Sequence, residues 1–564
     1  MKFFVITVCR DGDEFLSQCV DSVLSQTHTD WTMCIVVDDS MSAVGAKTLS
    51  VANKLKNKSS RIRVVANRDR LYALRNLVEN IDRYCPHDAV VVELDGDDYL
   101  ADKQVLSVLD KEYSADDQLD VLWTQFRNIG GKVGFCRALP AKANPATHPW
   151  VSSHLKTFRK RVLWGVRREV FLDESGKWWK TATDRAFFLP MLSLARKRKF
   201  LNRVCCVYRR RKTDNDPALQ RKTAKAICHR LAGAFTFTSR NVLFIISGLG
   251  CSPDRQLCYN EKRPFLGVLS MSAHLRARGH NVVLVDRMLN PSWFPADETL
   301  LEWADVVGLH VATPTRRDGY GLIEDIRAKG FKGRLLSGGP HSVLFPEELL
   351  KRGVDYACTY EADYEISRLV EDGDAPNAER RVVNLDSLPF PDYELVQSKS
   401  YRYARGWSFD ASQPVISLSS SRGCPHICDV GRLYGRDWYA QSPYRMVLDV
   451  AYAQRVLGAK AIYFCDSCFD CDRARILFFC RQLGEEGIGV RWACDLYGAR
   501  VGDKALIQAM AQAGCVGLCV EAGTDRLLIS SCESSAVRCH ERKYSPSRVL
   551  SVADAQEGRC RSGK

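Results

Sequence analysis

No run of 18 or more apolar residues occurs in the sequence, which excludes the class of proteins that cross a membrane on apolar helices. The apolar stretch at residues 3–8 is too short for the hydrophobic region of a secretory signal peptide, and acidic residues follow it closely. The 23 cysteines have irregular spacings, which is not the pattern of a disulfide framework. We therefore expect free thiols and a reducing, cytoplasmic compartment.

Acidic residues are fewer than basic residues. The chain has 67 Asp and Glu and 81 Lys and Arg, which gives a net charge of +14. Much of the excess lies in two runs, at 156–168 and 196–212. Such runs form either a solvated basic face or a surface that attracts a sugar diphosphate, a phosphorylated lipid or the surface of a membrane. No nucleic-acid-binding motif accompanies them, so we expect no nucleic-acid partner.

Short apolar runs alternate with amphipathic stretches along most of the chain. This alternation is typical of βαβ units and parallel sheets, whose ligands bind at the carboxyl ends of the strands. We therefore predict an α/β multidomain chain. The expected strands are 3–8, 32–37, 61–66 and 89–94 in the first series, 241–247, 280–286, 304–311, 333–339 and 354–360 in the second, and 414–420, 461–466, 489–495 and 516–523 in the third.

Acidic residues follow two strands of the first series. Asp38 and Asp39 end the second run, and Asp95, Asp97 and Asp98 follow the fourth in the sequence ELDGDDYL. Parallel strands bring both groups to one edge of the sheet, where clustered carboxylates need a cation or water. Carboxylate and phosphate oxygens are the ligands that Mg²⁺ and Mn²⁺ prefer. The pattern therefore predicts a divalent cation at this edge.

The segments VITVCRDGDEFLSQCVDSVLSQTHTDWTMCIVVDDS and ELDGDDYL resemble the family 2 glycosyltransferases, which have the GT-A fold. The resemblance implies inverting transfer of a sugar from a nucleoside diphosphate sugar to a hydroxyl of a glycan, lipid or small-molecule acceptor, with peripheral membrane association as one setting. It implies that Asp38, Asp39 and Asp95 bind the nucleotide sugar and that Asp95 and Asp97 bind Mn²⁺ or Mg²⁺, with Asp98 as a neighbouring candidate. A domain that binds these ligands without turnover is the alternative.

The same resemblance points to a catalytic base in the segment WWKTATDRAFFLPML. Asp184 matches the position of the family's base, although Thr183 stands where the family has Glu. A carboxylate there would take the proton of the acceptor hydroxyl. The alternative for Asp184 is an acid at the start of a helix. Trp178, Trp179 and His154 either line the acceptor pocket or pack in the core.

The segments GVLSMSAHLRARGHNVVLVD, ADVVGLHVATPT and LLSGGPHSVLFPEELLKRGVDYACTYEADYE resemble the cobalamin-binding domain that precedes many radical S-adenosylmethionine domains. The resemblance implies a flavodoxin-like domain in which groups around Thr313, Gly338 and Gly339 contact cobalamin. The Asp-x-His-x-x-Gly signature is absent, so we expect no histidine on the lower face of the cobalamin. A flavodoxin-like domain that binds no ligand is the alternative.

The segment SSSRGCPHICDVGRLYGRDW resembles the C-x3-C-x2-C motif of radical S-adenosylmethionine enzymes, whose cysteines hold a 4Fe-4S cluster. Cys424 and Cys428 match the motif, but Gly431 stands at the third position, and the cysteines within 465–471 are an alternative source of ligands. Glu521 matches a position near S-adenosylmethionine. Four strands are expected where the family barrel has six. We therefore predict a partial barrel without radical activity, with a working cobalamin-dependent radical enzyme as the alternative.

These resemblances divide the chain into segments. The polar sequence after the third series has no sustained periodicity and is typical of disorder. The expected segments are a glycosyltransferase-like domain at 1–235, a cobalamin-binding-like domain at 240–372, a linker at 373–410, a partial radical S-adenosylmethionine domain at 411–528 and a disordered tail at 529–564.

Overall fold

The computed structural model describes most of the chain, and its residues form two compact units. Unit 1 comprises Met1–Thr238 and Ala277–Gly279, and unit 2 comprises Ser239–Arg276 and His280–Lys564. No helix within the described part of the chain is long and apolar enough to span a membrane. The described residues are 1–209, 216–235, 237–248, 263–289, 298–373, 384–396, 414–425, 437–497, 503–522, 525–530 and 549–551.

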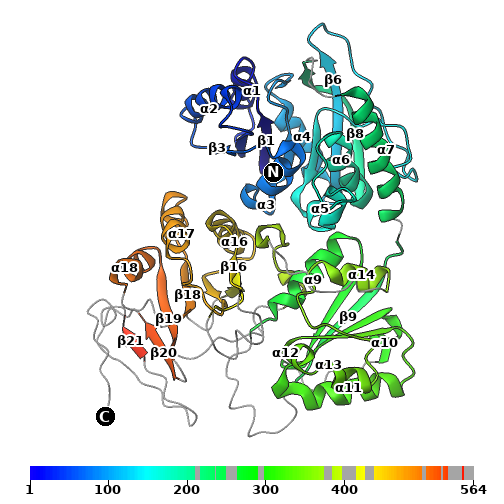
Figure 1. Ribbon diagram of the computed structural model, residues 1–564, viewed down its shortest axis with the longest axis vertical. Coiled ribbons are helices and arrows are strands. Elements are labelled where there is room, and N and C mark those ends of the chain that lie inside the picture. Colours follow the sequence, from blue (N-terminus) through cyan, green and yellow to red (C-terminus); the bar gives the residue numbers. More distant parts are fainter. Residues whose placement is uncertain are drawn as a thin grey trace. The chain divides into compact units, whose positions relative to one another are not determined.

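Unit 1 is built on one mixed sheet of eight strands (Figure 1). The strands are β1 (Phe3–Cys9), β2 (Trp31–Val37), β3 (Ile62–Ala66), β4 (Val90–Glu93), β5 (Tyr99–Leu100), β6 (Leu119–Asn128), β7 (Lys156–Arg159) and β8 (Lys197–Tyr208). Their order is β3-β2-β1-β4-β7-β6-β8-β5. The first four strands pair in parallel, as predicted, whereas β7 is antiparallel to both β4 and β6. The antiparallel β7 therefore joins the parallel half of the sheet to the remaining strands.

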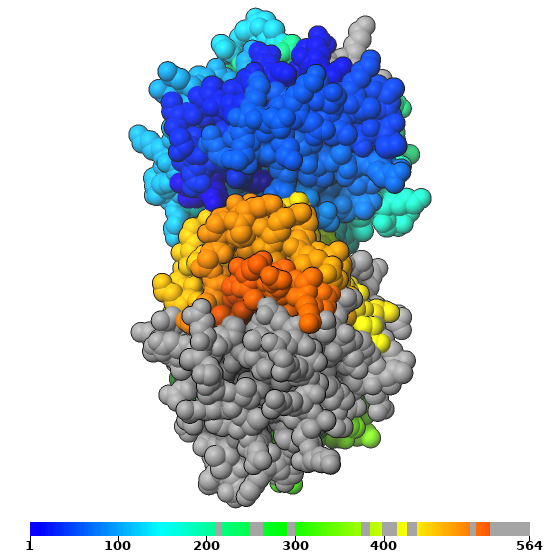
Figure 2. All heavy atoms as spheres, turned by 90° about the vertical axis from the view of Figure 1, so that its left-hand side faces the viewer, coloured from blue at the N-terminus to red at the C-terminus, as the bar shows by residue number. Residues whose placement is uncertain are grey.

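The parallel half of this sheet is covered on both faces. The residues of Phe3–Ile6 are at most 2% exposed, as expected for a parallel strand between helical layers. Helix α1 buries Leu16, Cys19, Val20 and Val23, which share one helical stripe. Residues of the first hundred positions gather on one continuous face of unit 1 (blue in Figure 2). The helices are α1 (Leu16–Leu24), α2 (Ala43–Lys56), α3 (Tyr72–Tyr84), α4 (Val105–Ala115), α5 (Lys160–Trp164), α6 (Thr183–Leu194) and α7 (Pro217–Ala234).

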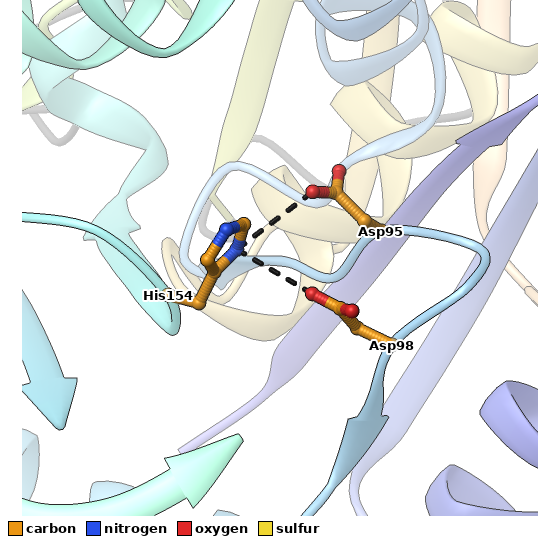
Figure 3. Close-up of side chains that lie close together, drawn as sticks. All are labelled: Asp95, Asp98 and His154. Atoms are coloured by element: carbon orange, nitrogen blue, oxygen red, sulfur yellow. Dashed lines mark ion pairs between the residues drawn. The ribbon is translucent and has the colours of Figure 1, made fainter. Parts of the chain in front are cut away.

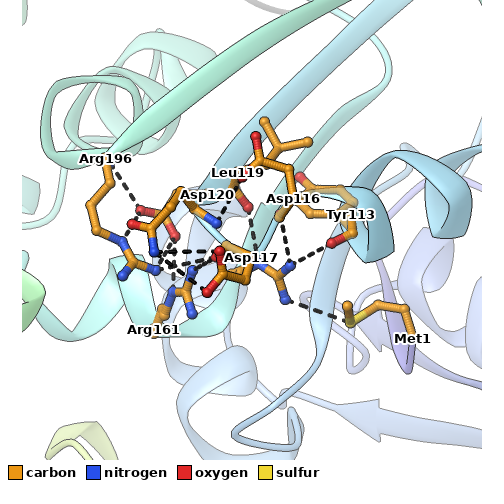
Figure 4. Close-up of polar contacts among 10 residues, drawn as sticks. Met1, Tyr113, Asp116, Asp117, Leu119, Asp120, Arg161 and Arg196 are labelled. Atoms are coloured by element: carbon orange, nitrogen blue, oxygen red, sulfur yellow. Dashed lines mark hydrogen bonds and ion pairs between the residues drawn. The ribbon is translucent and has the colours of Figure 1, made fainter.

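One arginine from each basic run, Arg161 and Arg196, lies beside acids of unit 1 (Figure 4). Nε of Arg161 lies 2.9 Å from one carboxylate oxygen of Asp120, and Nε of Arg196 lies 3.1 Å from the other. Asp120 is 3% exposed, and burial raises the pKa of its carboxyl against the opposing effect of Arg196. These ion pairs give one arginine of each basic run an acidic partner within unit 1.

The first sheet of unit 2 consists of five parallel strands. They are β9 (Asn241–Ile246), β10 (Asn281–Asp286), β11 (Val306–His310), β12 (Arg334–Gly338) and β13 (Tyr356–Ala357). The order β10-β9-β11-β12-β13 is that of flavodoxin, which confirms the predicted flavodoxin-like fold. Because the strand order reverses between β9 and β11, their carboxyl ends flank the crevice where such sheets bind ligands.

Helices cover both faces of this sheet (Figure 1). Leu243 and Ile245 pack on one face with α10 and α11, whereas Val242, Phe244 and Ile246 pack on the other with α9 and α14. This alternation within β9 follows from the two-residue period of a strand. The helices are α9 (Leu266–Ala277), α10 (Glu298–Trp303), α11 (Arg316–Ala328), α12 (Pro340–Leu344), α13 (Pro346–Lys351) and α14 (Glu365–Glu371).

The second sheet of unit 2 contains the four strands expected in the third series and two more. Four strands pair in parallel, with β14 at one edge. They are β14 (Val415–Leu418), β17 (Ala461–Phe464), β18 (Arg491–Tyr497) and β19 (Cys515–Ala522). Strand β20 (Asp525–Ser530) pairs antiparallel with β19, and β21 (Val549–Ser551) pairs with β20. The helices are α16 (Pro443–Arg455), α17 (Arg473–Glu485) and α18 (Lys504–Gln512).

The two added strands differ from the disorder expected for 529–564. Residues 529–530 belong to β20, and residues 549–551 form β21. The free edge of β19 offers a row of backbone donors and acceptors, so a segment with no sequence periodicity can pair there. The rest of this tail lies outside the described residues.

Candidate functional site

The two acidic groups of unit 1 lie at one edge of the sheet. Asp38 and Asp39 follow β2, and Asp95 to Asp98 follow β4, with β1 between the two strands. Cys9 ends β1 between them. Burial raises the pKa of the Cys9 thiol to about 12, with further contributions from Asp97 and Asp38. Acids from both groups therefore raise the pKa of the same thiol, which agrees with their position at one edge of the sheet.

The two acids after β2 have different surroundings. Asp38 is buried, and its carboxylate accepts hydrogen bonds from the backbone N–H groups of Leu71 at 2.8 Å and Tyr72 at 3.0 Å. Asp39 has a left-handed backbone, with φ of 57°, and its side chain is 26% exposed. Its carboxylate lies 3.9 Å from the guanidinium of Arg10. Asp38 thus holds the start of α3, while Asp39 is the acid that solvent reaches.

Asp95, Asp98 and His154 form a group whose ligand atoms all lie within 4.8 Å of one another (Figure 3). Nδ1 of His154 lies 3.7 Å from Asp95 and 3.6 Å from Asp98. The side chain of Asp95 is 47% exposed, whereas those of Asp98 and His154 are 0% and 11% exposed. Among the described residues this is the one group of three or more potential metal ligands with such spacing.

The membership of this group differs from the predicted pair Asp95 and Asp97. A turn in which the N–H of Asp98 donates to the carbonyl of Asp95 at 3.0 Å brings the fourth residue of DGDD back beside the first. Asp97 is half-buried, and its carbonyl accepts a hydrogen bond from Nε of Arg209 at 3.1 Å. The turn therefore brings Asp98, and not Asp97, to His154.

The electrostatics of the group fit a divalent cation. Burial, together with Asp95, raises the pKa of the Asp98 carboxyl to about 9. Burial also lowers the pKa of His154, which keeps the imidazole neutral and able to donate a lone pair. A cation would relieve the repulsion between the two acids and favour their ionised forms. Two carboxylates and an imidazole suit Mn²⁺ in particular, since it accepts nitrogen as well as oxygen ligands.

A buried lysine lies between two further acids. Lys156 is 1% exposed and pairs with Glu93 at 3.0 Å and with Asp184, which lies in the first turn of α6. Burial raises the pKa of the Asp184 carboxyl, but the Lys156 ammonium outweighs burial and holds that pKa at about 2. Burial raises the pKa of Glu93 to about 7 against the pull of the same ammonium. Asp184 is therefore ionised at neutral pH, with its side chain 49% exposed.

The aromatic candidates take structural positions. The ring of Trp178 stacks on Phe171 with centroids 6.1 Å apart, and Nε1 of Trp179 donates to the carbonyl of Val170 at 3.3 Å. Both tryptophans pack against the core of unit 1. Of the three aromatic candidates, His154 is the one that joins the acidic group.

Unit 2 contains a cavity of about 710 Å³ at the carboxyl ends of its strands. His310, Gly338 and Gly339 line it from β11 and β12, and Ser419 and Cys465 line it from the second sheet. A side chain at Gly338 would extend into open space, where the nearest atom lies 3.9 Å away. Bare glycine backbone at the wall of a large cavity is the cradle that a bulky planar cofactor such as cobalamin needs.

The remaining candidates of unit 2 are only partly described. Thr313 begins a short 3₁₀ helix and is not among the residues that line the cavity. Cys424 is 2% exposed, whereas Cys428 and Gly431 lie outside the described residues. Glu521 lies in β19, but its side chain is also outside the described set.

The sulfur atoms of Cys468 and Cys471 lie 2.8 Å apart, just after β17. The Cys471 thiol and burial both raise the pKa of Cys468, and Cys424 contributes to the same shift. These three thiols are therefore neighbours in the fold, although 44 positions separate Cys424 from Cys468 in the sequence.

Two family models match the chain, each in one of the units. The Glycosyl transferase family 2 model matches residues 4–215, and the B12 binding domain model matches residues 258–370. The chain carries a family 2 glycosyltransferase domain and a B12-binding domain. These matches confirm the two resemblances and the multidomain α/β fold.

Curated relatives align with different parts of the chain. "Uncharacterized methyltransferase PH0819" of Pyrococcus horikoshii is 23% identical over 296 residues, which cover 47% of this chain and 62% of the relative. Chondroitin synthase of Pasteurella multocida is 29% identical over 197 residues, which cover 34% of this chain and 19% of the relative. The chain thus spans less than two thirds of either relative.

Solved structures of two kinds are similar to the chain. S. aureus TarS in complex with UDP-GlcNAc is 16% identical with a TM-score of 0.30, over 38% of this chain and 60% of TarS. The radical S-adenosylmethionine methyltransferase TsrM from Kitasatospora setae, with cobalamin and a [4Fe-4S] cluster bound, is 16% identical with a TM-score of 0.37, over 50% of this chain and 59% of TsrM.

Sequence reasoning missed two residues of the glycosyltransferase domain. His154 was expected in an acceptor pocket or the core, and Lys156 was noted only as the start of a basic run. Lys156 begins β7 and His154 lies two residues before it, and β7 pairs antiparallel with β4, whose end leads into the acidic turn. The sequence predicted no strand at residues 156–159, so it offered no signal that a buried lysine there needs an acidic partner.

Proposed function

We propose that unit 1 transfers a sugar from a nucleoside diphosphate sugar to an acceptor hydroxyl, with inversion and with the help of Mn²⁺ or Mg²⁺. The observation that carries the proposal is the convergence of Asp95, Asp98 and His154 within 4.8 Å at the carboxyl ends of a parallel sheet. The match of this domain to family 2 glycosyltransferases supports it. A binding domain without turnover would have the same acids but no transfer activity.

In this proposal Asp95, Asp98 and His154 hold the cation, with Asp97 as a further acid in the same turn. The cation supplies a positive charge that stabilises the leaving diphosphate. Asp39, the exposed acid after β2, accepts hydrogen bonds from the nucleoside, while Asp38 keeps the loop before α3 in place.

We assign the role of base to Asp184. Its carboxylate is half-exposed and stays ionised because Lys156 lies beside it. A half-exposed, ionised carboxylate can accept the proton of the acceptor hydroxyl. Lys156 is a positioning residue in this scheme, since it is 1% exposed and acts through Asp184 and Glu93.

Removing divalent cations tests the proposal. We expect EDTA to reduce transfer or hydrolysis of nucleotide sugars to background, and Mn²⁺ to restore it, because the diphosphate then regains its counter-charge. The measurement is release of the nucleoside diphosphate from a panel of UDP, GDP and CDP sugars with simple glycan and lipid acceptors. Full activity in EDTA, or tight diphosphate binding with no turnover on any donor, would contradict the proposal.

A second function is favoured for unit 2 by the B12 match and by the glycine-edged cavity at the switch point. We propose that it binds cobalamin, with Gly338 and Gly339 at the wall and Thr313 nearby, and that it lacks radical activity because Gly431 replaces the third cysteine. We expect anaerobic iron–sulfur reconstitution of the full chain to yield well under four irons per chain. A stable cluster that cleaves S-adenosylmethionine would instead establish the radical enzyme.

A further inference from the structure

The cavity of unit 2 lies where the strand order of the first sheet reverses. Its wall includes the ends of β11 and β12, and His310 is the last residue of β11. Ligands of doubly wound sheets bind outside the carboxyl ends of the strands at this point. Among the residues that line the cavity, His310 is the only histidine.

The position of His310 is fixed from several sides. Its carbonyl accepts hydrogen bonds from the backbone N–H of Ser247 at 3.0 Å and from the Ser247 hydroxyl at 2.9 Å. Its ring packs against Phe265, with centroids 4.3 Å apart. Gly339 has φ of 91°, and a Cβ there would lie 3.0 Å from Nε2 of His310. The imidazole thus packs beside Phe265 and Gly339, and the missing Cβ of Gly339 leaves room for it.

The chemistry of the ring suits a metal ligand. An imidazole at the wall of a cavity can offer the lone pair of a ring nitrogen to a bound metal, and histidine is the commonest protein ligand of metals. Histidines that ligate metals commonly donate the second ring N–H to a backbone carbonyl or a carboxylate, which orients the ring.

We propose that Nε2 of His310 is an axial ligand to the cobalt of a cobalamin in this cavity. A cobalt–nitrogen bond forms as the bond to a coordinated water breaks, with no change in oxidation state. The proposal rests on cobalamin binding by unit 2 and is independent of glycosyl transfer by unit 1. From the sequence we expected no histidine on the lower face of the cobalamin, and residues 249–262, which follow β9, contain none. The proposal revises this expectation, because the histidine comes from the end of β11.

Electron paramagnetic resonance of the full chain with cob(II)inamide tests this ligation. Cobinamide lacks the nitrogenous base of cobalamin, so any nitrogen splitting of the cobalt lines comes from the protein. We expect triplet splitting from the natural protein and doublet splitting from protein labelled with [¹⁵N]histidine. In His310→Ala the splitting should disappear, while cobinamide remains bound when measured by ultrafiltration.

His341→Ala is the matched control, because His341 lies in the same domain, is bonded to Tyr320 at 2.8 Å and does not line the cavity. It should keep the splitting. Bound cobinamide without nitrogen splitting in the natural protein would overturn the His310 assignment and leave cobalamin binding intact. Splitting that persists in His310→Ala would overturn the assignment as well. Failure of the natural protein to bind cobinamide or cobalamin would overturn both proposals.

Discussion

Replacing Asp95 with alanine should lower Mn²⁺-dependent sugar transfer by roughly 10²–10³-fold, the range seen when one group that stabilises transition-state charge is removed. Asp95 contributes the exposed carboxylate of the group that it forms with Asp98 and His154. Without it the cation keeps one buried carboxylate and one imidazole, so it binds more weakly and neutralises the diphosphate less well. Initial rates at saturating donor across a Mn²⁺ titration measure the loss.

Two variants sharpen this experiment. Asp21→Ala removes an exposed acid of α1 that pairs with Lys58, and it should leave the rate unchanged. Asp97→Ala distinguishes two assignments of the metal ligands. The sequence motif assigns the cation to Asp97, whereas the turn in the structure places Asp98 beside His154. We expect Asp97→Ala to cost less than Asp95→Ala. Asp95→Ala with the activity of the natural protein, and with an unchanged melting temperature, would refute the metal site.

Replacing Lys156 with methionine should lower the free energy of unfolding of unit 1 by about 3–5 kcal/mol, the usual cost of removing one partner from a buried ion pair. The ammonium is the shared counter-charge of Glu93, which is 6% exposed, and Asp184. Methionine has a similar volume, so the lost charge, and not a cavity, dominates the effect. Urea unfolding followed by tryptophan fluorescence measures the change.

Adding Glu93→Gln to Lys156→Met should recover part of the lost stability, because the carboxylate left without a partner is then removed as well. Lys199→Met is the matched control: Lys199 is 45% exposed and pairs with Glu112 on the surface, so its loss should cost at most about 1 kcal/mol. Equal losses in free energy of unfolding for Lys156→Met and Lys199→Met would show that the buried ion pairs stabilise unit 1 no more than a surface ion pair does.

The βαβ segments were predictable because the pattern that defines each strand and helix lies within a few consecutive residues. Residues 3–8, 32–37 and 61–66 became β1, β2 and β3, since runs of β-branched residues between amphipathic stretches favour strands covered by helices on both sides. Parallel pairing then placed the acids after 37 and after 94 at one edge. The expected carboxyl-end position of the site followed from topology alone.

The basic run at 196–212 shows the limit of such reasoning. Most of it forms β8, whose pairing with β6 depends on residues almost eighty positions earlier in the chain. Its charges meet acids such as Asp120 only after that pairing. Tertiary contacts thus give part of this run acidic partners, although the side chain of Arg196 stays 41% exposed.

The sequence by itself determined the α/β architecture, the acidic edge of unit 1 and the match of two segments to known domains, because these depend on short periodicities and contiguous motifs. Only the tertiary structure decided that Asp98 joins Asp95, that His154 and Lys156 arrive from β7, and that His310 lines the cavity. Each of these depends on a turn or a strand pairing between distant residues, and local pattern carries no information about which distant strands will pair.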